Sequence, residues 1–282
     1  MPAITAAGSF TGTRARNIVW QGWSPAGDQP KLGSVVIAHG YGEHIGRYSR
    51  VAERLCENGF SVFGVDHHGH GRSGGKRGRI SIRAAVTDLH QLTVRVVQAQ
   101  EPELPRFLIG HSMGGLIAMH YTLAHQQQLS GLVLSSPLSS VEGSWPLLTV
   151  GRVLGLLLPG APVSKIDPRL VSRDVSVTAQ YGSDELNYHG PVPAATASEF
   201  IRETAVIKQR AREITLPVLL LLGTGDRICS PAAAEALASN FGSREMTVKR
   251  YPGLFHELFN EPEREQVTGD VVSWLTERST PA

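Results

Sequence analysis

The sequence has very little cysteine: two residues, Cys56 and Cys229, among 282. They lie far apart and form no Cys-x-x-Cys pair, so neither a disulfide framework nor a zinc motif is indicated. We expect both to be free thiols of a protein in a reducing compartment.

Long apolar runs and blocks of like charge are also missing. No stretch of about 18 uninterrupted apolar residues occurs, so the sequence predicts no transmembrane helix. The first ten residues, MPAITAAGSF, contain neither a basic nor an extended apolar region and do not resemble a secretion signal. The formal net charge is only +2, from 27 basic and 25 acidic side chains, so we expect no nucleic-acid partner. A cytoplasmic globular protein is the first expectation.

Short apolar segments rich in β-branched residues alternate with longer segments of helical periodicity. This alternation predicts an α/β fold with a mostly parallel sheet flanked by helices. The predicted strands are 35–38, 61–65, 107–109, 132–134, 218–222 and 246–251, and the predicted helices are 47–57, 82–96, 114–125, 232–241 and 262–278. Residues 15–23 could add an antiparallel strand at the start.

The alternation breaks between residues 138 and 205. This stretch contains six prolines and an apolar segment at 147–158, then becomes polar before the α/β pattern resumes. We expect a cap inserted over the carboxyl edge of the sheet, where open α/β sheets bind ligands. The expected organisation is a core formed by 1–137 and 206–282, with a cap formed by 138–205.

Two serines stand in Gly-x-Ser-x-Gly motifs, Ser73 and Ser112. A nucleophile elbow needs a strand directly before the serine and a helix directly after it. Ser112 follows the apolar residues 107–109 and precedes a predicted helix, whereas Ser73 is followed by the basic run Lys-Arg-Gly-Arg. Ser112 is therefore the predicted nucleophile, and we expect Ser73 to be a loop residue.

The remaining members of a serine triad should follow in the order acid, then histidine. Asp226 comes directly after the predicted strand 218–222, and His256 follows the last predicted strand in a loop. We predict that His256 removes the proton of the Ser112 hydroxyl while Asp226 orients the imidazole.

An ester-cleaving serine also needs N–H donors for the oxyanion that forms. The backbone N–H of Met113, next after the nucleophile, is one predicted donor. The other is the backbone N–H of Tyr41, in the loop His-Gly-Tyr-Gly after the first parallel strand.

Two further patterns could indicate cofactor sites, and neither has the right context. The Gly-x-Gly-x-x-Gly run at 69–74 follows a strand but opens no helix, which argues against dinucleotide binding. His67, His68 and His70 resemble a metal cluster, but no acid or cysteine set accompanies them by motif. We expect a structural loop here and a protein that needs neither cofactor nor metal.

Taken together, these motifs resemble those of the monoacylglycerol lipases, a family of the α/β-hydrolase superfamily, and its bacterial members in particular. The resemblance covers nearly the whole chain and rests on HGYGEHIGRY at 39–48, DHHGHGRSGG at 66–75, GHSMGG at 110–115, GTGDR at 223–227 and YPGLFH at 251–256. It implies an α/β-hydrolase fold with a helical cap. The implied activity is hydrolysis of a monoacylglycerol to glycerol and a fatty acid through an acyl-enzyme.

The resemblance also implies substrate-binding residues. Glu43 and Arg47 would lie on the glycerol side, and His111 and Tyr181 would shape the polar end of the pocket. From the residues alone, Glu43 and Arg47 at i and i+4 could equally form an ion pair. Many relatives carry a small or aliphatic residue where this chain has Tyr41, so the phenol could narrow the acyl entrance.

The apolar segment at 145–158 would span about 21 Å as a helix, too short for a hydrocarbon core of about 30 Å. We expect its inner face, including Leu154 and Leu157, to line the acyl tunnel. Part of its outer face would contact micelles or membranes at their periphery. Packing on the protein core alone is the other possibility.

Other functions on this fold remain open. A lysophospholipase or a general carboxylesterase would use the same chemistry. A non-catalytic binding protein is an alternative of another class, against which the complete triad argues. A dehalogenase or epoxide hydrolase would need an aspartate where Ser112 stands.

Overall fold

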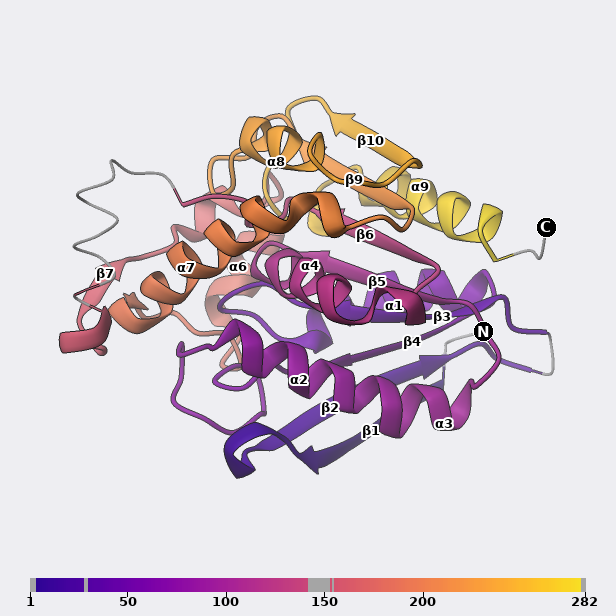
Figure 1. Ribbon diagram of the computed structural model, residues 1–282, viewed down its shortest axis with the longest axis horizontal. Coiled ribbons are helices and arrows are strands. Elements are labelled where there is room, and N and C mark those ends of the chain that lie inside the picture. Colours follow the sequence, from indigo (N-terminus) through magenta and orange to yellow (C-terminus); the bar gives the residue numbers. More distant parts are fainter. Residues whose placement is uncertain (1–3, 28–29, 142–152, 154, 280–282) are drawn as a thin grey trace.

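The computed structural model describes residues 4–27, 30–141, 153 and 155–279 (Figure 1). Its centre is an eight-stranded sheet in the order β1-β2-β4-β3-β5-β6-β9-β10. The strands are β1 (Ile4–Thr11), β2 (Asn17–Ser24), β3 (Gly33–Ala38), β4 (Phe60–Val65), β5 (Arg106–His111), β6 (Gly131–Ser135), β9 (Val218–Gly223) and β10 (Met246–Tyr251). The last six pair in parallel, which confirms all six strands predicted from the sequence.

The two N-terminal strands are the antiparallel part of the sheet. β2 pairs antiparallel with both β1 and β4 and confirms the strand proposed at 15–23, although it begins at Asn17. Ala15 instead closes a tight turn with a φ of 54°. β1 was not predicted, because its sequence, ITAAGSFT, has few large apolar side chains.

Helices cover both faces of the sheet, as alternating side chains of a buried strand require. The core helices are α1 (Ser49–Glu57), α2 (Ile82–Leu92), α3 (Gln98–Gln100), α4 (Met113–His125), α8 (Pro231–Ala238) and α9 (Arg264–Glu277). α1 and α9 pack with Val35 and Ile37 of β3 in one core, whereas α2, α4 and α8 pack with Val36 in the other. Because the strands are apolar on both faces, one face packs into each of the two hydrophobic cores.

All five predicted helices are present, with ends that differ by up to four residues, and two of these differences have a local structural reason. The helix expected from residue 47 begins at Ser49, because Ile45–Tyr48 form a 3₁₀ turn. The helix expected at 82–96 changes after Leu92 into a π-helical turn, Thr93–Val97. There the hydroxyl of Thr93 donates to the carbonyl of Leu89 at 3.0 Å, which is a known way to bend a helix.

Between β6 and β9, which are neighbours in the sheet, the chain leaves the core. The described elements of this excursion are β7 (Pro162–Ser164), α6 (Val175–Ser183), β8 (Val192–Pro193) and α7 (Ala194–Arg210). Figure 1 places α6, α7 and β7 together at one end of the molecule. α7 runs through residue 205, where the cap was expected to end, and its Ile207 belongs to the core packed around α4. Within the described residues, every helix is too short or too polar to cross a membrane.

Candidate active site

Ser112 stands at a sharp turn between β5 and α4. β5 ends at His111 and α4 begins at Met113, so one residue joins strand to helix. Ser112 has φ 54° and ψ −120°, a strained conformation for a residue with a side chain. The glycines on either side of Ser112 are required because backbone atoms of other residues lie too close for a side chain. A Cβ on Gly114 would lie 1.9 Å from the carbonyl oxygen of Ala38, and a Cβ on Gly110 would lie 2.5 Å from the carbonyl oxygen of Gly114. The turn is thus the geometry of a nucleophile elbow.

Ser73 has different surroundings. Its hydroxyl accepts a hydrogen bond from the backbone N–H of Val19 at 2.8 Å, which ties the loop to β2. The second Gly-x-Ser-x-Gly motif therefore lies in a loop that is tied to β2.

Asp226 and His256 come from the loops after β9 and β10 and form a direct pair. Nδ1 of His256 donates to Oδ2 of Asp226 at 2.8 Å. The other carboxylate oxygen accepts the backbone N–H groups of Ile228 at 2.8 Å and Cys229 at 3.0 Å. Burial opposes ionisation of Asp226, but His256 and these donors outweigh it and lower the pKa of the carboxyl. The acid is therefore ionised and held in one orientation.

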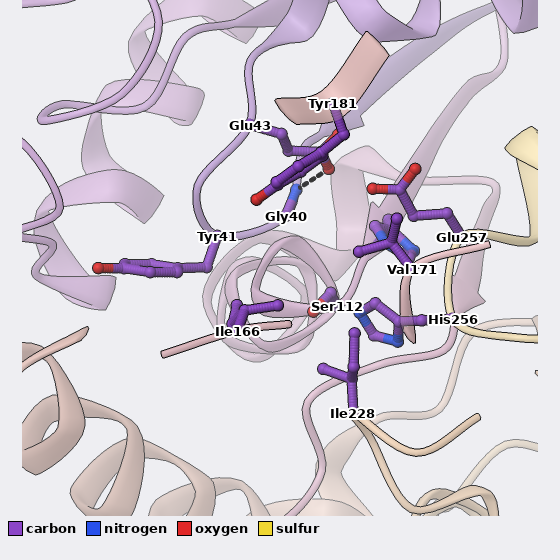
Figure 2. A pocket seen from close by; sticks show the side chains of 11 residues that line it. Gly40, Tyr41, Glu43, Ser112, Ile166, Val171, Tyr181, Ile228, His256 and Glu257 are labelled. Atoms are coloured by element: carbon purple, nitrogen blue, oxygen red, sulfur yellow. Dashed lines mark hydrogen bonds between the residues drawn. The ribbon is translucent and has the colours of Figure 1, made fainter. Parts of the chain in front are cut away.

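Ser112 and His256 line one cavity, and Figure 2 shows the two side chains side by side in it. The cavity has a free volume of about 20 Å³, room for one water molecule. Its other lining residues are Gly40, Tyr41, Glu43, His111, Ile166, Val171, Tyr181, Ile228 and Glu257. A substrate must therefore displace side chains to reach Ser112.

A buried ionic network closes the polar end of this cavity. Arg47 contacts Glu43 at 2.8 Å and holds Glu257 through two hydrogen bonds of 2.6 and 2.7 Å. Burial disfavours the charged form of Glu43, yet Arg47, with weaker help from neighbouring groups, lowers its pKa to about 2. The ring of Tyr181 lies 4.9 Å from the Arg47 guanidinium. Glu43 and Arg47 thus form the ion pair that their spacing allowed, while Glu43 also lines the cavity.

The two predicted oxyanion donors are backbone N–H groups close to the nucleophile. Tyr41 lines the cavity, and Met113 follows Ser112 directly. A Cβ on Gly40 would lie 3.3 Å from Cβ of Ser112, so the loop that carries Tyr41 passes directly beside the serine. Within the described part of the chain, neither N–H has a hydrogen-bond acceptor.

The remaining predicted substrate residues lie at different distances from this site. His111 lines the cavity with its ring 4.8 Å from that of His256, and its Nδ1 donates to the carbonyl of Ser135 at 3.2 Å. Burial, with His256 as the next cause, lowers the pKa of His111 to about 4, so the ring is neutral near pH 7. Leu157 is 69% exposed and lines neither this cavity nor the second one described below. Leu154 lies outside the described residues.

Comparison with known proteins agrees with this geometry. A family model described as serine aminopeptidase S33 matches residues 29–263. A monoacylglycerol lipase of Mycolicibacterium smegmatis is 41% identical over 269 residues, 95% of each chain. The chain belongs to the monoacylglycerol lipase family of α/β-hydrolases.

Two solved structures are similar to this chain in fold as well as in sequence. The monoacylglycerol lipase of Paleococcus ferrophilus superposes with a TM-score of 0.79 at 29% identity, over 99% of this chain and 100% of that one. A thermostable carboxyl esterase of Bacillus coagulans in complex with glycerol gives 0.84 at 25% identity, with the same shares covered. With the elbow, these findings make this member of the monoacylglycerol lipase family a carboxylic ester hydrolase.

A second cavity, of about 220 Å³, adjoins the first. Tyr41, Ile166 and Tyr181 line both cavities and so form the boundary between them. The rest of its lining comes from the segment between β6 and β9: Lys165, Pro168, Gly182, Tyr188, His189 and Gly190. The phenol of Tyr41 is fixed at this boundary, since its hydroxyl donates to the carbonyl of Gly78 at 3.0 Å.

Sequence reasoning missed several residues of the catalytic cavity. Glu257 directly follows His256, and Ile228 lies two positions after Asp226, so proximity in sequence to the predicted triad could have pointed to them. Ile166 and Val171 come from the segment between β6 and β9, and no local pattern marks them.

Cys229 was expected only to be a free thiol, which is how it occurs. Its Sγ lies 4.0 Å from Oγ of Ser112.

The histidines at 67–70 form part of a buried cluster. The rings of His39 and His67 lie 4.4 Å apart, and those of Tyr41 and His70 5.2 Å apart. Burial lowers the pKa of His70 to about 3, so the ring is neutral. Among the described residues, no three His, Cys, Asp or Glu side chains are arranged to hold a metal ion.

Proposed function

We propose that this protein hydrolyses monoacylglycerols to glycerol and a fatty acid. The observation that carries the proposal is the Asp226–His256 pair, joined at 2.8 Å, in one cavity with the strained Ser112. A polar network closes the same cavity, as a substrate with a glycerol leaving group requires. The similarity to proteins named monoacylglycerol lipases supports glycerol as the alcohol that is released.

The proposed reaction uses only groups of this chain and water. Oγ of Ser112 attacks the ester carbonyl while His256 takes its proton, and the N–H groups of Tyr41 and Met113 bind the oxyanion. The intermediate collapses when the imidazolium gives that proton to the leaving glycerol oxygen, which leaves an acyl-serine. Water, deprotonated by His256, then attacks the acyl carbon, and the fatty acid leaves when the imidazolium returns that proton to Oγ of Ser112.

The polar network supports a glycerol site in which a carboxylate accepts a hydrogen bond from a substrate hydroxyl. A carboxylate has about four acceptor positions. Glu43 fills three of them with the N–H of Gly40 at 2.6 Å, the hydroxyl of Tyr48 at 2.8 Å and the guanidinium of Arg47. One position remains for a substrate hydroxyl, as the proposed roles of Glu43 and Arg47 require.

The second cavity is the proposed path of the acyl chain. It is reached from Ser112 past Tyr41, Ile166 and Tyr181, so Tyr41 sets the width of the passage. The cap, expected at 138–205, thereby controls access and leaves bond cleavage to the core.

The outer surface of the cap is proposed to contact lipid. Large apolar side chains are exposed there, at 81% for Leu156, 69% for Leu157, 58% for Leu158 and 49% for Val163. Such a patch is characteristic of surfaces that dock on membranes or micelles. Together with two buried free cysteines, it supports a cytoplasmic protein in peripheral contact with membranes.

A carboxylesterase acting on short acyl chains is the second candidate. The observation that favours it is the free volume of only about 20 Å³ beside Ser112. A panel of monoacylglycerols of increasing acyl length, lysophosphatidylcholine and p-nitrophenyl acetate separates the possibilities. The proposal requires the highest kcat/KM on a monoacylglycerol. A maximum on lysophosphatidylcholine or on the acetate would reject it.

A further inference from the structure

The charged side chains of this protein are unevenly distributed along the chain. Residues 1–27 and 67–87 contain seven of the 27 basic side chains and none of the 25 acidic ones. The two acids that flank the second segment, Asp66 and Asp88, are 0% exposed, and their carboxylates accept the backbone N–H groups of Arg72 and Thr13. Neither segment therefore presents a carboxylate to solvent.

The two segments lie together at the carboxyl edge of the sheet. β2 and β4 are antiparallel, so the start of β2 and the end of β4 are at the same edge. The N–H of Gly74 donates to the carbonyl of Asn17 at 2.8 Å, and a Cβ on Gly75 would lie 3.6 Å from Cδ of Arg16. The loop after β4 thus lies against the turn between β1 and β2. Figure 1 shows the start of α2, which follows this loop, at the same end of the molecule as α6.

Most of the basic side chains in these segments are not neutralised. Within the described residues, five of the seven form no ion pair: Arg14, Arg16, Arg72, Lys76 and Arg79. We refer to these five as the basic surface; the first, third and fourth are exposed and the other two are half-buried. The remaining two contact the segment between β6 and β9, since Arg77 donates to the carbonyl of Leu186 at 2.6 Å and Arg83 pairs with Glu203 at 3.3 Å.

The basic surface adjoins exposed apolar side chains. The exposed leucines at 156–158 lead into a turn in which the N–H of Ala161 donates to the carbonyl of Leu158 at 2.9 Å. A Cβ on Gly160, within this turn, would lie 3.4 Å from Nη2 of Arg79. The Arg79 guanidinium therefore lies beside the end of the apolar segment, and the two kinds of surface are continuous.

The loop that carries the basic surface also packs beside the second cavity. A Cβ on Gly78 would lie 2.4 Å from the ring of Tyr188, which lines that cavity. The carbonyl of Gly78 accepts the hydroxyl of Tyr41, at the boundary between the two cavities. A partner bound to this loop would thus lie next to the proposed path of the acyl chain.

We propose that the basic surface and the leucines at 156–158 together dock the protein on a membrane that contains anionic phospholipids. The basic side chains bind the phosphates of the headgroups, and the leucines enter the interface. In this orientation an acyl chain can pass from the bilayer into the second cavity. The inference rests on the proposed function and adds the charge of the membrane from which the substrate is drawn.

Cosedimentation with vesicles tests the dependence on charge. The wild-type protein should bind vesicles of equal parts phosphatidylcholine and phosphatidylglycerol at least about 100-fold more tightly than vesicles of phosphatidylcholine alone. Raising the salt concentration from about 0.1 M to about 1 M shortens the Debye length from about 10 Å to about 3 Å and should remove most of this difference. Equal affinities for the two kinds of vesicle, or a difference that salt does not reduce, would overturn the inference.

Arg72→Gln with Lys76→Gln removes two exposed charges of the basic surface. A basic side chain near an anionic membrane contributes about fivefold to affinity, so this double variant should bind the mixed vesicles roughly 25-fold more weakly. Its affinity for phosphatidylcholine vesicles should not change. Neither residue lines a cavity, so kcat on a soluble acetate should also stay as in the wild type.

The matched control is Lys208→Gln with Arg244→Gln. These two residues are again one lysine and one arginine, both exposed and without an ion pair in the described part of the chain, near the end of α7 and before β10. The control should bind the mixed vesicles within about twofold of wild type. Circular dichroism and urea unfolding establish that both double variants are folded. Equal losses in the two would show that only the net charge matters and would overturn the inference.

Vesicle binding is measured without substrate, so the inference and the proposed function fail separately. A protein that hydrolyses monoacylglycerols in detergent micelles but binds both kinds of vesicle equally overturns only the inference. A protein that shows the charge-dependent binding but hydrolyses none of the esters in the panel supports the docking surface and rejects the proposed activity. Tight binding of a single-stranded RNA without binding to the mixed vesicles would identify a nucleic acid as the partner and overturn the inference.

Discussion

Nδ1 of His256 donates to Oδ2 of Asp226 at 2.8 Å, and the two residues are brought together from loops that follow neighbouring strands, β9 and β10. Oδ1 of Asp226 is occupied separately by two backbone N–H groups. The carboxylate therefore has a fixed orientation and holds the imidazole in the tautomer that presents Nε2 as the base.

Asp226→Asn should reduce kcat by about 10⁴-fold, because an amide N–H facing Nδ1 favours the wrong imidazole tautomer. The amide oxygen can still accept the N–H groups of Ile228 and Cys229, so the fold should be retained. Asp270→Asn is the matched control, since Asp270 accepts the hydroxyl of Tyr251 at 2.8 Å outside the catalytic cavity. Steady-state kinetics on a soluble ester measure kcat of both variants. A loss below tenfold in Asp226→Asn, or an equal loss in Asp270→Asn, would contradict the assignment.

Arg47→Met should destabilise the protein by about 3–5 kcal/mol, because it leaves Glu43 and Glu257 buried without their shared cation. In that variant Glu43 has lost the cation that lowers its pKa, so protonation relieves its unpaired charge and the loss relative to wild type should shrink as the pH falls. Urea unfolding at pH 7 and pH 5 measures both effects.

The control for this variant is Arg54→Met. Arg54 pairs with Glu57 on the exposed surface of α1, where an ion pair contributes roughly 0–1 kcal/mol. Similar free energies of unfolding for the Arg47 and Arg54 variants would show that the buried network is not structural.

Acid should weaken the fold through its buried histidines as the pH falls below about 6.5. Burial lowers the pKa of His39 and His67, and lowers that of His70 to about 3 and that of His111 to about 4. In the unfolded chain these imidazoles bind protons near pH 6.5, so below that pH the unfolded state carries more protons than the folded one. The free energy of unfolding should therefore fall from pH 7 to pH 5, by up to about 1.4 kcal/mol per pH unit for each histidine.

Carboxylates whose pKa is lowered, such as Glu43, affect the free energy of unfolding in a different pH range. Their contribution is present above the unfolded value of 4.5 and is lost only below it. Urea unfolding between pH 5 and pH 7.5 therefore reports the histidines. A free energy that is constant or rises as the pH falls would contradict neutral buried imidazoles.

Leu156→Asp with Leu157→Asp should weaken binding to phosphatidylcholine vesicles and lower kcat/KM on long-chain monoacylglycerols in vesicles. Both side chains are exposed, so the fold should be unaffected and activity on a soluble acetate should remain. Ala232→Asp with Ala236→Asp, two exposed positions of α8, adds the same charge outside the cap. Cosedimentation and parallel kinetics on the two substrates test this. Equal losses on both substrates, or equal effects of the two double variants, would reject the lipid-contact surface.

The parts of the fold that the sequence predicted depend on local patterns. The parallel strands were recognisable because they are apolar on both faces, and the elbow because Ser112 directly joins a strand to a helix. β1 lacks such a pattern, since it is an edge strand held by its pairing with β2.

The parts of the site that were not predicted depend on contacts between distant segments. Arg47 binds Glu257 across 210 positions of the chain, and no spacing rule connects them. The same holds for Ile166 and Val171, which the segment between β6 and β9 brings to the cavity beside Ser112.

The most direct test of the account is the release of glycerol and fatty acid from a monoacylglycerol by the wild-type protein, Ser112→Ala and Ser73→Ala. The wild type should release the two products in equal amounts, and Ser112→Ala should lose several orders of magnitude in kcat. Ser73→Ala should keep its kcat and lose only about 1 kcal/mol of stability, since its hydroxyl accepts the N–H of Val19. If Ser112→Ala kept more than about 1% of the wild-type kcat, or if Ser73→Ala lost activity to the same extent, the assignment of Ser112 as the nucleophile would be wrong.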